Sequence, residues 1–372
     1  MVKIVHVTNK KDLRQFIYLP EKIHRNHKNW IYPLYSDEWI LFDPQKNRAF
    51  DYCDTVLLLA KKQGKIVGRI MGIINWKYNE IHGVKNGRFC FMETWDDPEV
   101  FHALVSYIER WARAKGMTKV IGPFGFSDKD PQGFLIEGFN EPTVMVTNCS
   151  YPYMVKHIEN EGYSKNLDLV QYTIDIPDEI PLHYERIAQR PIKNGYQLIE
   201  FTKRRQLKNY IRPILRLTNE AYTEIFGFVP FSEEEMDEFA KRYLLILDPA
   251  FIKVINDSKD EVVAYIVGIP NLSKGLKKAK GKLFPFGFLQ IFLSMKQTQQ
   301  LDLFLGAIKK ELRNTGLDTI LAKAMLHSAK VRRMETMDSH VVMESNTRMR
   351  AEVERLGGQI YKRYRVFQKD LI

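Results

Sequence analysis

The sequence predicts an α/β protein of two tandem lobes, each a mixed, twisted sheet flanked by helices, and two observations carry this prediction. Strand-like runs alternate with single helical patterns along both halves of the 372 residues, as expected for helices packed on a sheet. Residues 65–75 and 261–271 align without gaps, share Val, Ile, Gly, Ile and Asn at matching positions, and each follow another strand across a short turn. This pattern indicates an internal repeat. Such hairpins need antiparallel neighbours, so neither sheet is expected to be all parallel.

The first lobe is expected to span residues 1–176. An alternating strand at 3–8 leads into helical patterns from Lys11, and a hairpin follows at 55–75. A helix should begin at Asp96-Asp97-Pro98 and end at Gly116, because carboxylates cap free N–H groups, proline suits a first turn and glycine suits a C-cap. The other elements predicted for this lobe are strands at 88–94, 118–122, 143–147 and 169–176 and a helix at 153–161.

A connector is predicted at residues 177–194, which hold Pro177, Pro181, Pro191 and many charges. After it the same order of elements returns, so the second lobe is expected to span residues 195–372. Its predicted strands are 196–202, 251–256, 261–271, 298–308, 335–344 and 359–368, and its predicted helices are 207–226, one that begins at Gly316, and 347–356.

Composition narrows the class of protein. With 45% hydrophobic and 27% charged residues the chain is globular, which excludes wholesale disorder and a mainly coiled-coil protein. The spacing of its three cysteines fits neither a disulfide framework nor a zinc site, so no metal is predicted and a reducing, cytoplasmic location is expected. His24, His27 and His340 are isolated histidines, expected to be structural or exposed. The net charge of +11 suits nucleic acid, anionic lipid or a phosphate-rich small molecule.

Residues 303–322 are the most informative segment of the chain. A strand runs into a polar turn with Lys309, Lys310 and Arg313, and a helix begins at Gly316. Unpaired N–H groups and the helix dipole favour a phosphate at such a helix start, and glycine lets a ligand approach the backbone. A plain strand–turn–helix connection with solvated basic side chains explains the same spacing, and both interpretations stay open.

Here the chain resembles the GNAT acyltransferase superfamily, whose Arg/Gln-x-x-Gly-x-Gly/Ala signature lies between a strand and a helix. The matching run is Arg313-Asn314-Thr315-Gly316-Leu317-Asp318, with Asp318 in place of the last Gly or Ala. Residues 343–369 are similar to the GNAT ending, in which a strand, an Asn (here Asn346), a helix and a Gly-rich turn precede the last strand. The resemblance implies that acetyl-CoA or a longer acyl-CoA is bound as co-substrate. Its pyrophosphate would lie on Lys310, Arg313, Asn314, Thr315, Gly316 and Leu317, and its pantetheine arm on Asn346.

The resemblance covers nearly the whole chain and extends to a bacterial subgroup of two-lobed, tandem GNAT-like proteins, through residues 89–97, 122–142 and 281–288. The first lobe lacks the phosphate signature. At the matching place Glu93, Asp96 and Asp97 would repel a pyrophosphate. The resemblance therefore implies that coenzyme A binds to the second lobe, while the first closes the site or holds the acceptor.

Aminolysis of a thioester needs an unprotonated amine, an oxyanion stabiliser and a proton for the leaving thiolate. In GNAT proteins the splayed central strands direct N–H groups at the thioester carbonyl. The Tyr that many members place after the Asn is missing here, so Tyr364 or Tyr361 is the candidate acid, against the alternative of simple packing. Glu344, at a strand end, and Glu93, in an apolar strand, are candidates to deprotonate the amine. A solvated edge carboxylate is the alternative for Glu344.

An insert at residues 271–297 carries five lysines followed by the apolar run 283–295. A basic cluster beside bulky apolar side chains is typical of a segment that lies on a membrane surface. The alternative is a lid that folds on the protein's own core. The first interpretation predicts contact of residues 274–295 with the anionic inner face of a membrane, and a lipidic acyl donor or amine. No apolar run has the length of a membrane span or of a signal peptide.

We therefore expect an acyl-CoA-dependent N-acyltransferase that transfers an acetyl or longer acyl group to a primary amine held between the lobes. The alternative from another class is a non-catalytic ligand or lipid sensor that retains the fold. A nucleic-acid-binding regulator is less favoured, because the sequence has no helix-turn-helix, zinc-finger or RNP-type pattern; no nucleic-acid partner is expected.

Overall fold

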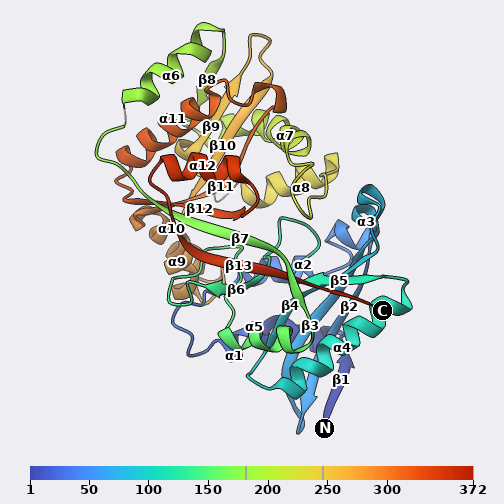
Figure 1. Ribbon diagram of the computed structural model, residues 1–372. Helices are drawn as coiled ribbons and strands as arrows, with labels where there is room; N and C mark the ends of the chain where they lie inside the picture. Colours follow the sequence, from blue (N-terminus) through green and yellow to red (C-terminus); the bar gives the residue numbers. More distant parts are fainter. Residues whose placement is uncertain (181, 245–246, 372) are drawn as a thin grey trace.

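The computed structural model describes residues 1–180, 182–244 and 247–371, and it shows two lobes joined by one 13-stranded sheet (Figure 1). The mixed α/β prediction is confirmed. The first five strands in spatial order are β1 Val2–His6, β2 Cys53–Lys62, β3 Lys65–Asn75, β4 Asn86–Thr94 and β5 Lys119–Gly122. The long strands β13 Gln359–Asp370 and β7 Ser164–Asp175 come next, followed by β12 Thr336–Met343, β11 Gln300–Ile308, β10 Val262–Pro270, β9 Ile252–Asn256 and β8 Gln197–Glu200.

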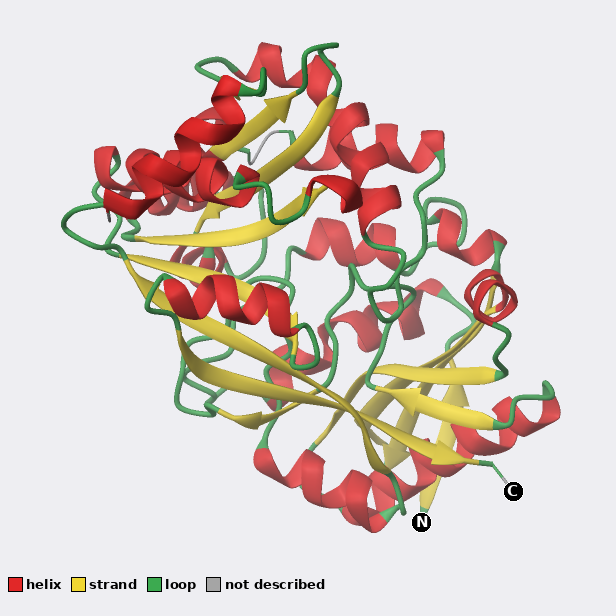
Figure 2. Ribbon diagram, turned by 45° about the horizontal axis from the view of Figure 1, so that its top comes forward, coloured by secondary structure: helices red, strands yellow, loops and turns green. Residues whose placement is uncertain are grey.

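The last strand of the chain belongs to both lobes. β13 pairs antiparallel with β5, where Phe367 lies opposite Gly122, and with β7 along most of its length. β7 in turn pairs with β12, where Ile174 lies opposite Met337. The two long strands run from one lobe to the other (Figure 2), and the C-terminus therefore lies on the N-terminal lobe. Pairing the two half-sheets in this way leaves no open strand edge between the lobes.

Each lobe contains one parallel strand pair whose strands then separate. β4 pairs with β5 at residues 86–88, and β11 pairs with β12 at residues 300–302. Beyond these residues β4 runs on toward helix α4, Pro98–Ala114, and β11 toward helix α11, Leu317–Val331. This equivalence supports the internal repeat, and it places Arg88 and Asp302 at matching positions.

Helices cover both faces of the sheet because neighbouring strand residues point to opposite sides. Leu58 faces α4, whereas Leu59 faces the side of α1, Lys10–Ile23. In the C-terminal lobe α11 packs on β9 and β10, and α7, Arg204–Ala221, packs on the opposite side of β10 and on β11. The remaining α-helices are α2 Tyr35–Leu41, α3 Trp76–His82, α5 Pro152–Asn160, α6 Leu182–Lys193, α8 Glu233–Tyr243, α9 Ser273–Ala279, α10 Gly287–Gln297 and α12 Thr347–Arg355.

Residues 143–147 and the connector are among the segments that differ from the prediction. Residues 143–147 form turns instead of a strand, since the Thr143 amide bonds to the Asn29 carbonyl and the Thr147 amide to the Val144 carbonyl. A short strand, β6 Phe134–Glu137, pairs with β13 instead. The predicted connector also contains the helix α6, which packs against α11.

Candidate active site

The basic bend predicted to bind pyrophosphate lies between β11 and α11. A 3-10 turn at Lys310–Leu312 follows the strand, and Gly316 caps the helix in the left-handed conformation, with φ of 92°. The first amides of α11 have no acceptor within the helix, because the residue four positions before each of them lies outside the helix. The predicted helix start is therefore confirmed, and its N–H groups are suited to an anion.

Basic side chains gather around one acidic residue beside this bend. Lys310 Nζ lies 2.7 Å from Glu224 Oε1, and both side chains are well exposed. The ion pair with Lys310, together with the charges of Arg313 and Arg348, lowers the pKa of Glu224. Arg348 stands on α12, whose N-cap is Asn346. The bend and the start of α12 thus form one basic surface with Glu224 as counter-ion.

Asn346 and Gly316 both have local structural roles. The side-chain oxygen of Asn346 accepts the Met349 amide at 3.2 Å, which caps α12 and leaves the side-chain NH₂ as the group a ligand could use. A Cβ atom on Gly316 would lie 2.9 Å from Cγ2 of Ile187 on α6. Close packing against α6 and the positive φ therefore each require glycine at this position.

A buried polar cluster that was not predicted lies where β11 and β12 separate. Asp302 ends the parallel pairing and accepts a hydrogen bond from Asn271 Nδ2 at 2.9 Å. Its partner across the pairing, Asp338, accepts bonds from Gln171 Nε2 at 2.8 Å and from the Tyr361 hydroxyl. Glu93 is a candidate because it is an acidic residue in an apolar strand. Asp302 is also an acidic residue in an apolar strand, so the same criterion would have predicted this cluster.

The two carboxyl groups and a lysine make this cluster electrostatically unusual. Burial and the charge of Asp338 raise the pKa of Asp302 well above its ordinary value. Burial also lowers the pKa of Lys362, whose ammonium donates to the Pro142 carbonyl oxygen. Perturbed groups of this kind gather at functional sites.

His340 adds a proton acceptor to the cluster. It stands on β12 with φ of 57°, and its amide donates to Asp338 Oδ1 at 2.7 Å. Burial lowers the pKa of its imidazole, which keeps the ring neutral at pH 7. Nε2 lies 3.1 Å from the Met145 carbonyl oxygen, and since a carbonyl only accepts, the hydrogen belongs on Nε2 and the lone pair on Nδ1. These bonds agree with the structural role expected for a lone histidine and also place its free Nδ1 beside the cluster.

Of the predicted catalytic residues, Tyr364 is connected to this cluster, and Glu344 lies beyond the end of β12. Tyr364 is fully buried, and its hydroxyl donates to Gln171 Oε1 at 3.1 Å, which connects it to Asp338 through Gln171. Glu344 follows β12, and its carboxylate is paired with Lys165 at 3.4 Å and with Arg363. Glu344 would have to break ion pairs in order to accept a proton.

Glu93 belongs to a second cluster, in the N-terminal lobe. Its Oε2 lies 2.9 Å from His24 Nε2, and His24 Nδ1 lies 3.0 Å from His27 Nδ1. Cys149 Sγ lies 3.6 Å from the same nitrogen of His27. Burial lowers the pKa of His27 to about 4 and raises that of Cys149 to about 11. Side chains that are isolated in the sequence are therefore neighbours in the fold. The charge of Glu93 raises the pKa of Cys149, and the charge of Lys362, from the other cluster, lowers it.

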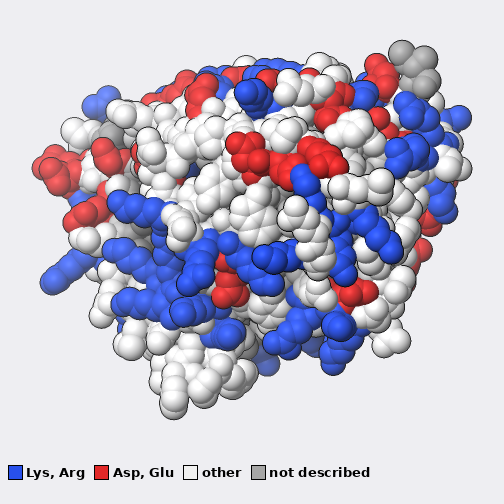
Figure 3. All heavy atoms as spheres, turned by 90° about the horizontal axis from the view of Figure 1, so that it is seen from below, with Lys and Arg blue, Asp and Glu red and all other residues white. Residues whose placement is uncertain are grey.

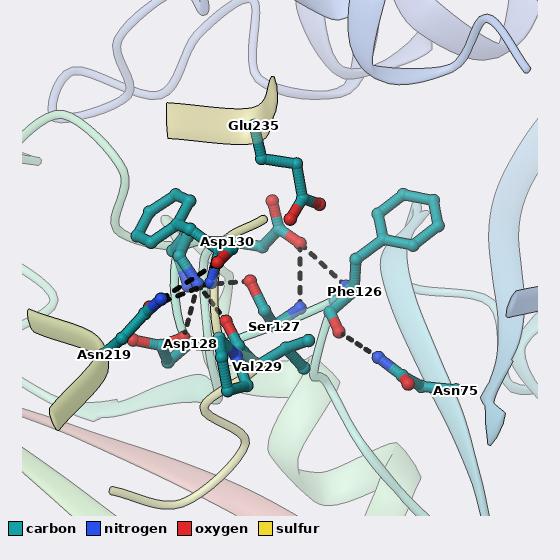
Figure 4. Close-up of polar contacts among 12 residues, drawn as sticks. Asn75, Phe126, Ser127, Asp128, Asp130, Asn219, Val229 and Glu235 are labelled. Carbon is teal, nitrogen blue, oxygen red and sulfur yellow. Dashed lines mark hydrogen bonds and ion pairs between the residues drawn. The ribbon is translucent and has the colours of Figure 1, made fainter. Parts of the chain in front are cut away.

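In the N-terminal lobe the chain itself fills the space where β4 and β5 separate. Arg88, at the position that matches Asp302, is buried and donates to the Phe126 carbonyl oxygen at 2.9 Å. Asp130 holds this loop through the amides of Phe126 at 2.7 Å and Ser127 at 3.3 Å (Figure 4). The same position of the repeat therefore anchors a loop in one lobe and carries a titratable acid in the other.

An apolar groove lies beside β10 and β11 in the C-terminal lobe. It is narrow, with a cavity volume of about 40 Å³, and is lined by apolar side chains that include Ile211, Ile214, Val267, Phe304 and Leu305. The register shift between β10 and β11 makes Phe304 a bulged residue. Its ring lies 5.8 Å from the His340 ring, edge to face, so the groove and the polar cluster meet at Phe304.

The basic and apolar insert is only partly folded onto the protein. Leu276 and Ile291 pack with Ile31 and Ile269, so one side is anchored as a lid would be. The other side exposes bulky residues, namely Phe284, Phe286, Phe288, Leu289, Phe292 and Leu293. In the described part of the chain, no helix combines the length and the apolarity needed to cross a membrane.

Two relatives match the chain over almost its whole length. A protein named bacterial ceramide synthase, from Caulobacter vibrioides, is 29% identical and covers 100% of this chain and 98% of its own. Protein YghO of Escherichia coli is 28% identical, with coverage of 98% and 94%. No family model matches the chain.

A solved structure agrees with the architecture as well. A tandem GNAT protein from the clavulanic acid biosynthesis pathway superposes with a TM-score of 0.57 at 12% identity, and covers 100% of this chain and 99% of its own. The superposition includes both lobes. In each lobe of this chain a parallel strand pair separates and one of its strands leads to a helix. The chain therefore has the two-lobed, tandem fold of the GNAT acyltransferase superfamily.

Proposed function

We propose that the protein is an acyl-CoA-dependent N-acyltransferase that joins a long acyl chain to the primary amine of a lipid-like acceptor. The position of Phe304 carries this proposal, because it lines the apolar groove and contacts His340 of the polar cluster. A long acyl chain would enter this narrow groove by parting its apolar side chains, and His340 would lie beside the thioester as a proton acceptor. The relative named bacterial ceramide synthase supports the choice, since a ceramide is the amide of a fatty acid and a long-chain amino alcohol.

The basic surface at the bend fits the phosphates of coenzyme A. Arg313 and Lys310 supply charge, the first amides of α11 supply donors, and the NH₂ of Asn346 supplies a donor for the pantetheine arm. Glu224 is exposed and is held there by Lys310, so an incoming phosphate could take its place without unfolding a helix. Acyl-CoA is a co-substrate in this proposal, and its thiol is the leaving group.

His340 is the residue that we assign to proton transfer. Its Nδ1 accepts a proton from the amine as the C–N bond forms, the C–S bond breaks, and the same proton then passes to the thiolate sulfur. The main-chain N–H of His340 donates a hydrogen bond to Asp338, which fixes the backbone that carries the ring. The hydrogen bond from Nε2 to the Met145 carbonyl oxygen fixes the tautomer of the ring. Glu344 and Glu93 are already paired with basic side chains, so we favour His340 over both as the base.

The exposed side of α10 and the preceding turn suits a membrane that supplies the acceptor. Phe284 and Phe286 are 80% and 68% exposed, which is costly in water and favourable at an acyl boundary. Exposed lysines at 274, 278 and 280 lie in and just after the neighbouring α9, where anionic headgroups would neutralise them. One face of the molecule also gathers Lys and Arg side chains around an uncharged projection (Figure 3).

The test is an assay of purified protein with 16-carbon acyl-CoA and a long-chain amino alcohol in anionic vesicles. We expect thiol release together with the amide product, identified by mass spectrometry, and much slower turnover with acetyl-CoA or with a short, soluble amine. A thermal-shift titration with the same thioester runs in parallel. Stabilisation by acyl-CoA without any amide product would instead support the non-catalytic sensor.

A further inference from the structure

The cluster of His24, His27 and Cys149 has no part in the acyl transfer proposed above. His24 and His27 lie at the end of α1 and in the turn that follows, whereas Cys149 comes from the segment before α5. One ligand atom of each side chain lies within 4.8 Å of the others. The fold thus brings the Cys149 thiol, which is far from both histidines in the sequence, next to their imidazoles.

Two of the separations lie within about 0.3 Å of those expected between ligands of one small cation, and the third, between Cys149 Sγ and His24, is within 4.8 Å. Zinc lies about 2.0–2.1 Å from imidazole nitrogen and about 2.3 Å from thiolate sulfur, so tetrahedral ligands sit roughly 3.3–3.6 Å apart. His24 Nδ1 and His27 Nδ1 are 3.0 Å apart, and Cys149 Sγ is 3.6 Å from His27 Nδ1. A catalytic Cys–His relay fits less well, because the sulfur is almost as close to Nε2 of His27, at 3.8 Å.

Glu93 fixes the tautomer and the orientation of His24 that metal binding requires. Its carboxylate accepts from His24 Nε2 at 2.9 Å, so the hydrogen of the neutral ring belongs on Nε2 and the lone pair of Nδ1 faces the cluster. A carboxylate behind a ligating imidazole is the usual partner that fixes tautomer and orientation in metal sites. This arrangement also gives Glu93 a role inside an otherwise apolar strand.

Stacked aromatic rings hold both imidazoles in place. The Tyr151 ring lies 5.1 Å from that of His24 and 4.4 Å from that of His27, nearly parallel to each, and Trp30 stacks on His24 at 5.4 Å. His24 is buried, whereas His27 and Cys149 are half-buried, so an ion can enter from their side. The rings are preorganised, which lowers the entropy lost on binding.

We propose that His24 Nδ1, His27 Nδ1 and Cys149 Sγ form a binding site for Zn²⁺ or a similar transition-metal ion. Without metal, the His27 Nδ1–H can donate to His24 Nδ1. Metal binding moves the His27 hydrogen to Nε2 and releases the thiol proton of Cys149 to water, because the ligand is the thiolate. The ion ties the end of α1 to the segment that carries Met145, whose carbonyl holds His340.

The site is tested by metal analysis and by cobalt substitution of the whole protein. Protein grown with added zinc and purified without chelator should hold about one equivalent of zinc by plasma mass spectrometry. After removal of the zinc, Co²⁺ should give the intense visible bands of a tetrahedral ion and a thiolate-to-cobalt charge-transfer band. Protein with little zinc whose Co²⁺ spectrum lacks the charge-transfer band would overturn the proposal.

Variants assign the ligands. Cys149→Ser should abolish the charge-transfer band, whereas the buried Cys53→Ser and the surface His102→Gln should leave the cobalt spectrum unchanged. Glu93→Gln leaves all three ligands in place and should weaken cobalt affinity by about 10–100-fold. A charge-transfer band that persists in Cys149→Ser contradicts the assignment. If that variant does not fold, the wild-type spectrum and Glu93→Gln decide. These measurements do not use acyl transfer, so their outcome is independent of the proposed activity.

Discussion

The ring of Phe304 meets the imidazole of His340 edge to face, with centroids 5.8 Å apart, across the gap between two strands that have stopped pairing. Phe304 is bulged out of its pairing with β10, and His340 lies in the register shift that separates Asp338 from Val341 on β12. Bulges re-aim side chains. Two such irregularities, on neighbouring strands, bring an apolar groove and a titratable cluster into contact.

The first prediction concerns acyl-chain length. Ile211 lines the groove from α7 and is only half-buried, so Ile211→Trp should fill the groove without disturbing the core. We expect kcat/KM for 16-carbon acyl-CoA to fall by about 10–200-fold, the range that pocket shape supplies, while turnover of acetyl-CoA changes little. Lys208→Trp, on the exposed side of the same helix, is the matched control. An equal loss with both donors would show that the groove does not hold the chain.

The second prediction concerns proton transfer. His340→Gln should lower kcat by about 10²–10⁴-fold, the usual contribution of a general base, with little change in KM. Burial lowers the pKa of His340, so the base is already neutral at pH 7. Protonation of the acceptor amine lowers the rate of both proteins, and protonation of His340 should lower the wild-type rate further as the pH falls below the ordinary histidine value of about 6.5. His327→Gln, at an exposed position of α11, is the control. A fall in rate below that pH that is the same in His340→Gln as in the wild type would exclude His340.

The third prediction uses opposite changes at the basic bend. Lys310→Gln removes a cation and should raise KM for acyl-CoA, whereas Glu224→Gln removes the competing anion and should lower it. Each effect should be only a few-fold, because both side chains are exposed and solvent screens their charges. Binding measured by calorimetry at low and high salt separates charge from other causes. Changes of the same sign in both variants would place the phosphates elsewhere.

Local patterns in the sequence predicted most of the fold. Apolar alternation predicted the strands, and the Asp-Pro and Gly signals predicted both ends of α4. Residues 143–147 were predicted to be a strand, but their main chain is bonded by distant partners such as Asn29 and His340. Tertiary contacts of this kind override propensity.

Only those parts of the candidate site that are formed by residues close together in the sequence were predicted. The bend at Gly316 is a local strand–turn–helix signal and lies where it was expected. Asp302 and Asp338 come from different strands, and their proximity depends on a parallel pairing that no local pattern encodes. The cluster around His24 and Cys149 joins residues 125 positions apart (149 − 24), which spacing rules for metal sites do not consider.

The fourth prediction concerns stability against pH. Asp302 has its pKa raised in the folded protein, so the folded state binds more protons there than the unfolded chain does. Its contribution to the free energy of unfolding is complete below the unfolded pKa of about 3.9 and is lost as the pH rises through the folded value. Urea unfolding at pH 5 and pH 8 should therefore show a loss of stability with rising pH that is smaller in Asp302→Asn. Equal losses in both proteins would mean that Asp302 is ionised throughout.

The last prediction concerns the membrane. If the exposed apolar side of the insert enters the acyl boundary, then Phe284→Ser, Phe286→Ser and Phe288→Ser together should reduce binding to anionic vesicles by at least about tenfold, because each buried ring is worth on the order of 1.5 kcal/mol. Ile81→Ser and Val331→Ser, which change apolar residues exposed elsewhere, are the matched controls.

Charge should contribute separately from the rings. Each of Lys274, Lys278 and Lys280 changed to Gln should cost about 1 kcal/mol, roughly fivefold in binding, and only at low salt. The ring variants should weaken binding at any salt, because burial of apolar area is not screened. Acyl transfer to an amine in vesicles should fall with binding, while transfer to the same amine in detergent micelles should not. Unchanged sedimentation of the triple Phe variant with anionic vesicles would mean that this surface faces something other than a lipid bilayer.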